Sequence, residues 1–240
     1  VVEEEGYDAE EARFATIVAN HVSMYDIIVL MALEMPSFVA KEAISRNPIV
    51  GPIAMGMQSI FVDRLASSNR SVVEGIRTRQ MELLDAKEKG GSSRPDSMAD
   101  VAPICIFPEG TTTNGKYLLP FKLGAFIAGA PVAPIVIEYP YKYWSPAYES
   151  IRGTELMFQT FAQPYHNVRV RRLPVVYPTE EMKKDPVKYA EHVRGVMVAA
   201  SHLELSDSTY YDKLEYHSII FKQPLPEAAR IKVRSQKKDQ

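Results

Sequence analysis

The chain has 240 residues, of which 46% are hydrophobic and 24% are charged, and its formal net charge is -2. This composition is typical of a globular domain with a substantial core, and it provides no positive excess that would neutralise nucleic-acid phosphates. The single cysteine, Cys105, excludes an internal disulfide and a metal site built from several cysteines, which fits a reducing compartment.

The first residues, Val1 to Glu5, form an acidic run rather than a signal peptide. Because the chain begins with Val1 and not with methionine, we expect a fragment of a longer protein. No apolar run in the chain reaches the roughly 20 residues of a membrane-spanning helix. We expect residues 1–11 to form an acidic leader before the folded domain.

Hydrophobic periodicity predicts alternating strands and helices after the leader. Residues 14–19 (FATIVA) predict a buried strand, and a turn around His21 leads into a helix over 24–33. Short apolar runs predict further strands at 37–40, 59–64, 101–107, 132–139 and 168–171. Helices are predicted within 47–56, over 69–87, over 122–128 and from Pro186 onward, and a loop is predicted at 90–95.

This order of elements predicts an α/β fold, a single domain with a largely parallel central sheet flanked by helices. The strand at 168–171 alternates in polarity, so we interpret Arg169 and Arg171 as residues of its solvated face. Asp185 before Pro186 matches a cap residue followed by a first-turn proline. We expect residues 206–240 to form a C-terminal extension or linker with a basic tail.

A histidine and an aspartate, His21 and Asp26, lie at the first strand-to-helix turn. Histidine exchanges a proton near neutral pH, and a nearby carboxylate can fix its tautomer. In one regular helix the two residues would lie roughly 140° apart, so we place His21 in the turn and Asp26 in the first helical turn. Catalysis is one interpretation of the pair. The other is a helix cap, because Ser23 and Asp26 form an S-x-x-D pattern.

A second polar cluster, residues 107–114 (FPEGTTTN), follows the predicted strand that contains Cys105. Its glycine and hydroxyl residues can hold an anionic or polyhydroxyl substrate, although the same residues also make an ordinary polar turn. Arg64 ends another predicted strand, where it can bind a phosphate or pair with Asp63. We interpret Cys105 as a packed core thiol because no basic residue flanks it closely.

Together these clusters resemble the glycerolipid and lysophospholipid acyltransferase family (PlsC-like) over about residues 12–205, which we take as the acyltransferase domain. The family carries an N-H-x4-D motif, a G-x-x-F-x-x-R motif, an F-P-E-G-T motif and a late strand that contains a proline. The matching residues here are Asn20, His21, Asp26, Phe61, Arg64, Phe107, Pro108, Glu109, Gly110, Thr111 and Pro134.

Within the family, residues 121–132 are most similar to the lysophosphatidylcholine and lysophosphatidylethanolamine acyltransferase branch. Thr112 stands where members that use lysophosphatidic acid often have arginine. The loss of that cation suits an acceptor whose phosphate is esterified.

The resemblance implies transfer of a fatty acyl chain from acyl-CoA to the free hydroxyl of a lysophospholipid, with His21 as general base oriented by Asp26. No metal is expected, and no cofactor besides acyl-CoA as co-substrate. The resemblance also implies a membrane surface of the endoplasmic reticulum as the setting, with the domain in a reducing compartment and with membrane segments that lie outside this fragment. The residues expected to contact substrate are Asn20, Arg64, Phe107, Pro108, Glu109, Gly110, Thr111 and Pro134, with Arg64 on a phosphate.

Several alternatives stay open. The acceptor can be lysophosphatidic acid or glycerol-3-phosphate. The chain can also be a thioester hydrolase in which His21 activates water, or a catalytically inactive lipid-binding module. The sequence determines neither the headgroup nor the acyl-chain preference, nor the oligomeric state.

Overall fold

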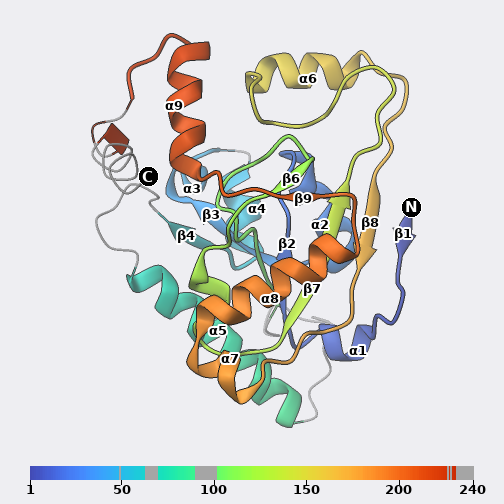
Figure 1. The fold of residues 1–240 in the computed structure, drawn as a ribbon, viewed down its shortest axis with the longest axis vertical. Coiled ribbons are helices and arrows are strands. Elements are labelled where there is room, and N and C mark those ends of the chain that lie inside the picture. The colour runs from blue at the N-terminus through green and yellow to red at the C-terminus, as the bar shows by residue number, and fades with distance from the viewer. Residues whose placement is uncertain (49, 63–69, 90–101, 226, 228, 231–240) are drawn as a thin grey trace.

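The computed structural model describes residues 1–48, 50–62, 70–89, 102–225, 227 and 229–230 (Figure 1). Among these residues the centre is a seven-stranded sheet in the order β1-β8-β7-β2-β5-β3-β4. Neighbouring strands run parallel except for β7 and β8, which confirms the predicted α/β fold with a largely parallel sheet. The strands are β1 (Val2–Glu3), β2 (Thr16–Ala19), β3 (Ser37–Lys41), β4 (Ile60–Val62), β5 (Ile104–Ile106), β7 (Val132–Glu138) and β8 (Arg169–Arg172).

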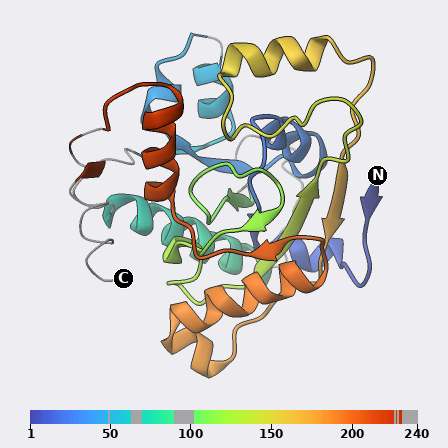
Figure 2. The same cartoon turned by 45° about the horizontal axis from the view of Figure 1, so that its top comes forward.

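Helices cover both faces of this sheet, and a short parallel pair, β6 (Tyr117–Leu118) and β9 (Glu204–Leu205), lies beside it (Figures 1 and 2). The helices are α1 (Ala9–Ala12), α2 (Tyr25–Glu34), α3 (Glu42–Ser45), α4 (Val50–Gly56), α5 (Arg70–Glu88), η1 (Leu123–Ala125), α6 (Gly153–Phe161), α7 (Glu180–Lys184), α8 (Pro186–Ala199) and α9 (Tyr210–Ile220).

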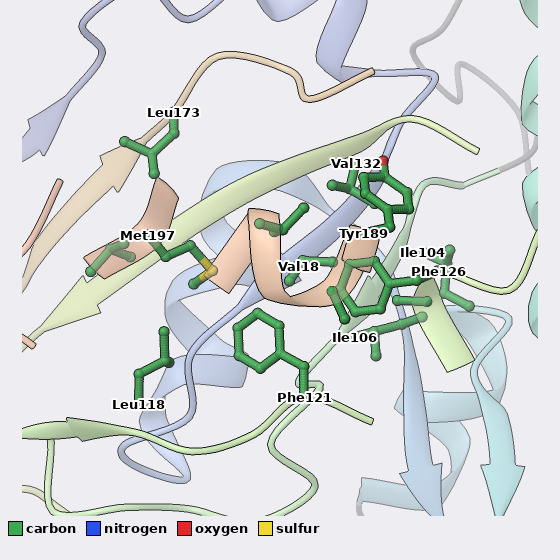
Figure 3. Packing of buried hydrophobic residues seen from close by; sticks show 14 of the residues in the cluster. Val18, Ile104, Ile106, Leu118, Phe121, Phe126, Val132, Leu173, Tyr189 and Met197 are labelled. Atoms are coloured by element: carbon green, nitrogen blue, oxygen red, sulfur yellow. The ribbon is translucent and has the colours of Figure 1, made fainter. Parts of the chain in front are cut away.

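Alternate residues of the central strands point to opposite faces and pack into two main cores, beside a small alanine cluster of Ala12, Ala15 and Ala133. Val18 of β2 packs on one face with Tyr189 and Met197 of α8, as Figure 3 shows. Ile17 of β2 packs on the other face with Leu30 of α2. Full burial of an apolar side chain contributes roughly 1.5–3 kcal/mol, so this alternation fixes the register of the central strands.

Most predicted elements are present in the structure. Cys105 is fully buried, as expected for a core thiol, and burial raises the pKa of its thiol. Asp185 caps α8 by accepting from the backbone N–H groups of Val187 and Lys188 at 3.1 and 3.3 Å. The predicted loop at 90–95 and the end of the strand at 59–64 lie outside the described residues.

The helix predicted over 122–128 is wrong in extent, because only Leu123–Ala125 form a 3-10 turn. Gly124 weakens a helix at this point, and Gly129 adopts a positive φ of 61° just beyond it. The turn therefore ends early and leads directly into β7.

Charged residues of β8 lie at the edge of the sheet. The guanidinium of Arg171 contacts carboxylate oxygens of Glu3 and Glu138 at 2.6 and 3.4 Å, and Arg169 lies 3.2 Å from Glu3. The arginines of this partly exposed face therefore form ion pairs. Through β1, two residues of the predicted acidic leader pair with this edge. Where the leader ends and the C-terminal extension begins stays a prediction.

Within the described ranges, every helix falls short of the length or apolar content required to cross a bilayer.

Candidate functional site

The first and third motifs lie side by side because their strands are neighbours. β2 and β5 run parallel, with Ile17 opposite Cys105. His21 follows the carboxyl end of β2, and Glu109 follows the carboxyl end of β5. Loops at the carboxyl ends of parallel strands are where α/β sheets commonly bind ligands. The sheet thus brings together residues 88 positions apart.

The His21 ring is hydrogen-bonded to the carboxylate of Asp26. Nδ1 of His21 lies 2.8 Å from Oδ2 of Asp26, whose side chain is fully buried. His21 lies in the turn before α2 and Asp26 in the helix's first turn, as predicted. The same oxygen accepts the backbone N–H groups of Val22 and Ser23 at 2.7 and 2.9 Å.

The contacts of Ser23 and Asp26 also bear on the alternative interpretation, in which Asp26 only stabilises the start of the helix. Oγ of Ser23 accepts from the N–H of Tyr25 at 3.3 Å, while Asp26 accepts from the N–H of Ser23. These two bonds satisfy backbone N–H groups at the start of α2, although its cap position, Met24, has no side-chain hydrogen bond. Asp26 therefore holds both the helix start and the imidazole, so the two interpretations are compatible.

The hydrogen bond to Asp26 determines the tautomer of the His21 ring. An ionised Asp26 only accepts, so Nδ1 carries a proton and Nε2 of a neutral ring presents a lone pair. The ring stacks on Phe107 at 4.0 Å between centroids with 15° between the planes. The stacking on Phe107 therefore fixes the plane of the imidazole ring, and the bond to Asp26 fixes which ring nitrogen points toward the carboxylate.

Tyr139, just beyond β7, contacts the other oxygen of Asp26. Its hydroxyl donates to Oδ1 at 2.6 Å. Burial and the negative charge of Asp26 raise the pKa of Tyr139, so the hydroxyl stays protonated and remains a donor. Sequence reasoning missed this residue. Its only signal was a polar group at the end of the predicted strand 132–139.

The carboxylate of Glu109 points into the protein. It is 2% exposed, and it accepts the N–H groups of His21 and Leu119 at 2.8 and 2.9 Å. Burial raises the pKa of Glu109 to about 8, although both backbone donors oppose the shift. Glu109 thus fixes the backbone of His21. The predicted contact between Glu109 and substrate stays a prediction.

The rest of this loop approaches His21 through its backbone. The N–H of Thr113 donates to the carbonyl of His21 at 2.8 Å. Gly110 has a φ of 70°, and a Cβ there would lie 2.3 Å from Nζ of Lys122. Only glycine fits this position without strain. Thr111 and Thr112 face a cavity that His21 also lines.

Three other residues that were predicted to contact substrate, Asn20, Pro108 and Pro134, take part in contacts within the fold. The side-chain amide of Asn20 donates to the carbonyl of Ile137 at 2.9 Å and accepts its N–H at 2.7 Å, which ties β2 to β7. The carbonyl of Pro108 accepts from Lys122, and Pro134 lies within β7 opposite Val18. Arg64 lies outside the described residues.

The helix α9 supplies a wall that sequence reasoning did not foresee. Lys213 is 8% exposed, and its Nζ donates to the carbonyl and hydroxyl oxygens of Thr112 at 2.7 and 2.9 Å. It also lies 3.4 Å from the carbonyl of Tyr148. Thr209 and Asp212 form a capping box that signals a helix here, but no local signal gives its place beside the site.

The cavity has a volume of about 680 Å³ and a wall of mixed character. Its size and apolar lining suit part of an acyl chain, and its cations suit a phosphate. Apolar lining residues include Met24, Ile27, Phe38, Val39, Ile44, Phe107, Ile151, Leu214 and Phe221. Polar lining residues include His21, Thr111, Thr112, Arg152, Lys213 and His217.

Known proteins are similar to this chain over much of its length. The family model described as Acyltransferase matches residues 2–138. Lysophospholipid acyltransferase LPEAT1 of Arabidopsis thaliana is 40% identical over 213 residues, which cover 88% of this chain and 50% of that protein. LPEAT2 of the same plant is 32% identical over 196 residues, covering 82% and 34%. Lysophosphatidylcholine acyltransferase 1 of Homo sapiens is 36% identical over 207 residues, covering 84% and 35%. The chain therefore spans a third to a half of the length of these relatives.

Proposed function

Because the chain belongs to the acyltransferase family, we propose that its His21 site transfers a fatty acyl chain from acyl-CoA to the free hydroxyl of a lysophospholipid. The observation that carries the proposal is the bond between Nδ1 of His21 and Asp26, which leaves Nε2 as a proton acceptor in a residue of the cavity wall. An alcohol is a weak nucleophile at neutral pH, so a positioned base is what this reaction requires.

In the proposed reaction, Nε2 of His21 removes the proton of the acceptor hydroxyl while its oxygen attacks the thioester carbonyl carbon. The C–O ester bond forms, the C–S bond breaks, and the imidazolium returns the proton to the leaving thiolate of coenzyme A. Asp26 keeps the ring in one tautomer and stabilises its charged form. Tyr139 would hold Asp26, and Glu109 would hold the backbone of His21.

The cavity wall supports the choice of substrates. Its apolar residues suit the acyl chain, and the hydroxyl of Thr111 suits the glycerol region of an acceptor. The hydroxyl of Thr112 is already bonded to Lys213 and to the carbonyl of Tyr148. The predicted phosphate contact of Arg64 belongs to this proposal, and the described wall contains two cations, Arg152 and Lys213, against one anion, Glu149. No metal or cofactor is needed for this scheme.

We propose lysophosphatidylethanolamine or lysophosphatidylcholine as the acceptor. Thr112 in place of an arginine supports an acceptor with an esterified phosphate, and the relatives are named for lysophospholipids and lysophosphatidylcholine. Lysophosphatidic acid and glycerol-3-phosphate are the competing acceptors. The proposed setting is a membrane, that of the endoplasmic reticulum, with the domain in a reducing compartment.

Release of the coenzyme A thiol tests the reaction class in the full-length protein. We expect release only when acyl-CoA and lysophosphatidylethanolamine or lysophosphatidylcholine are both present, with equal formation of the diacyl product. Release without any acceptor would show a thioester hydrolase. The absence of release, together with retained lipid binding, would show a binding module. Faster acylation of lysophosphatidic acid would reverse the choice of acceptor.

A further inference from the structure

The helix α6 presents its apolar side to solvent. Leu156 is fully buried beneath the helix, whereas Phe158 and Phe161 are 75% and 81% exposed. Met157 is also exposed, and positions 157 and 158 lie four and three residues before position 161, so the three side chains share one side of the helix. A surface helix normally turns such a stripe toward the core, so this face is built to meet a partner.

The loop before α6 extends this surface with large aromatic rings. Trp144 is 47% exposed, and Gln163 lies within 3.5 Å of both its backbone N–H and its carbonyl. Trp144 and Phe158 line one shallow groove, so loop and helix form a continuous surface. We call this surface the aromatic face. Its exposed members are Tyr141, Tyr143, Trp144, Met157, Phe158 and Phe161.

The chemistry of the aromatic face fits the interface of a lipid bilayer. Tryptophan and tyrosine prefer the zone between headgroups and acyl chains because their rings are apolar and their N–H and O–H groups are polar. The segment from Tyr141 to Phe161 carries two cations, Lys142 and Arg152, and two anions, Glu149 and Glu155, so its net charge is zero. A neutral segment of this kind matches zwitterionic lipids and gains nothing from anionic ones.

The aromatic face is continuous with the wall of the cavity. Tyr148, Ile151, Arg152 and Gly153 line the cavity, and Gly153 is also the first residue of α6. The guanidinium of Arg152 lies 5.8 Å from the ring centroid of Phe221, just after α9. Figures 1 and 2 both show α6 at an outer edge of the molecule, on the side away from α5, α7 and α8.

We propose that the aromatic face docks on a zwitterionic phospholipid bilayer and places the cavity of His21 next to the lipid surface. The proposal rests on the proposed acyltransferase function, which needs an acceptor that resides in such a bilayer. Phe158 and Phe161 enter the boundary of the acyl chains, and Trp144 lies at the headgroup level.

Trp144 is the only tryptophan in the sequence, so its fluorescence reports directly on this face. The 240-residue chain is mixed with phosphatidylcholine vesicles in the absence of acyl-CoA and acceptor. We expect a blue shift of the emission, quenching by lipids brominated near the top of the acyl chain, and co-sedimentation with the vesicles. Because the segment has no net charge, binding should change little with salt or with added phosphatidylserine.

Two double variants locate the contact. Phe158→Ser with Phe161→Ser should weaken vesicle binding at least tenfold, because two exposed rings lose their transfer into the interface. Met81→Ser with Val187→Ser, at exposed positions of α5 and α8, is the matched control and should bind as the wild type does. Circular dichroism and thermal unfolding check that each variant folds.

The fluorescence and vesicle-binding measurements distinguish failure of the docking proposal from failure of the proposed acyltransferase function. An unshifted Trp144 emission with vesicles would overturn the docking proposal, even if the protein acylates monomeric lysophospholipid. Equal weakening by both double variants would also overturn it. If the Phe158 and Phe161 variants change only the oligomeric state, the face is an interface between copies and the proposal fails. A shifted emission in a protein without transferase activity supports docking and rejects only the proposed function.

Discussion

Oε1 of Glu109 accepts a hydrogen bond from the backbone N–H of His21 at 2.8 Å, and this bond joins the ends of two neighbouring parallel strands. The carboxylate also holds Leu119, so it links three parts of the chain at one buried point. The motif that contains Glu109 therefore supports the proposed base directly. The pKa of Glu109 makes this link testable by pH.

Glu109→Gln should change how stability depends on pH. Folding raises the pKa of Glu109 from 4.5 to about 8, so between these values the folded state binds more protons than the unfolded state. The wild type should lose up to about 1.4 kcal/mol of unfolding free energy for each pH unit in this window, relative to the glutamine variant. Chemical denaturation of both proteins at several pH values measures the difference. A difference that stays constant between pH 5 and 8 would contradict the account.

Asp26→Asn should remove the negative charge at position 26 while keeping the hydrogen bonds that the side chain makes to the turn. The amide oxygen can replace Oδ2 toward His21, Val22 and Ser23, and the amide nitrogen can donate to the hydroxyl of Tyr139. The fold should survive, while kcat falls by about 10²- to 10⁴-fold because the imidazolium loses its counter-charge. Unfolding curves and steady-state kinetics together test this. An asparagine variant with near-normal kcat would remove Asp26 from the mechanism.

Tyr139→Phe removes one donor from a buried carboxylate. The unfolding free energy should fall by about 1–3 kcal/mol, because Oδ1 of Asp26 loses its partner at 2.6 Å. We expect kcat to fall about tenfold with little change in KM, because Asp26 would hold the ring less firmly. The exposed Tyr177→Phe serves as the matched control and should behave like the wild type. A change confined to KM would instead place Tyr139 in substrate binding.

Lys213→Met tests the contribution of α9. The substitution keeps much of the side-chain volume but leaves the carbonyls of Thr112 and Tyr148 without this donor. The protein should lose about 1–3 kcal/mol of stability, and kcat/KM should drop because the Thr111 and Thr112 wall loosens. The exposed Lys188→Met is the control. Stability and kinetics equal to those of the control would show that α9 only covers the site.

The sequence was sufficient for the fold class and for the pair at the centre of the site. The strand, turn and helix around His21 were predictable because apolar periodicity and S-x-x-D chemistry are local properties. The geometric argument that separates His21 from the helix was confirmed, and so was the buried strand of Cys105.

The remaining contacts depend on long-range packing. Tyr139 reaches Asp26 only because β7 lies next to β2, and Lys213 reaches Thr112 only because α9 folds back over the cavity. No residue spacing encodes either contact. The inward orientation of Glu109 was equally hidden, because the motif identifies the residue but not the direction of its side chain.

The central claim is that His21 removes the proton of the acceptor hydroxyl, and the most direct test is acyl transfer by His21→Ala. With acyl-CoA and lysophosphatidylethanolamine, formation of the diacyl product should fall by about 10²- to 10⁴-fold while the fold stays intact. The exposed histidine of α8 supplies the control, His192→Ala, which should retain full activity. Product formation by His21→Ala within a few-fold of the wild type would contradict the account.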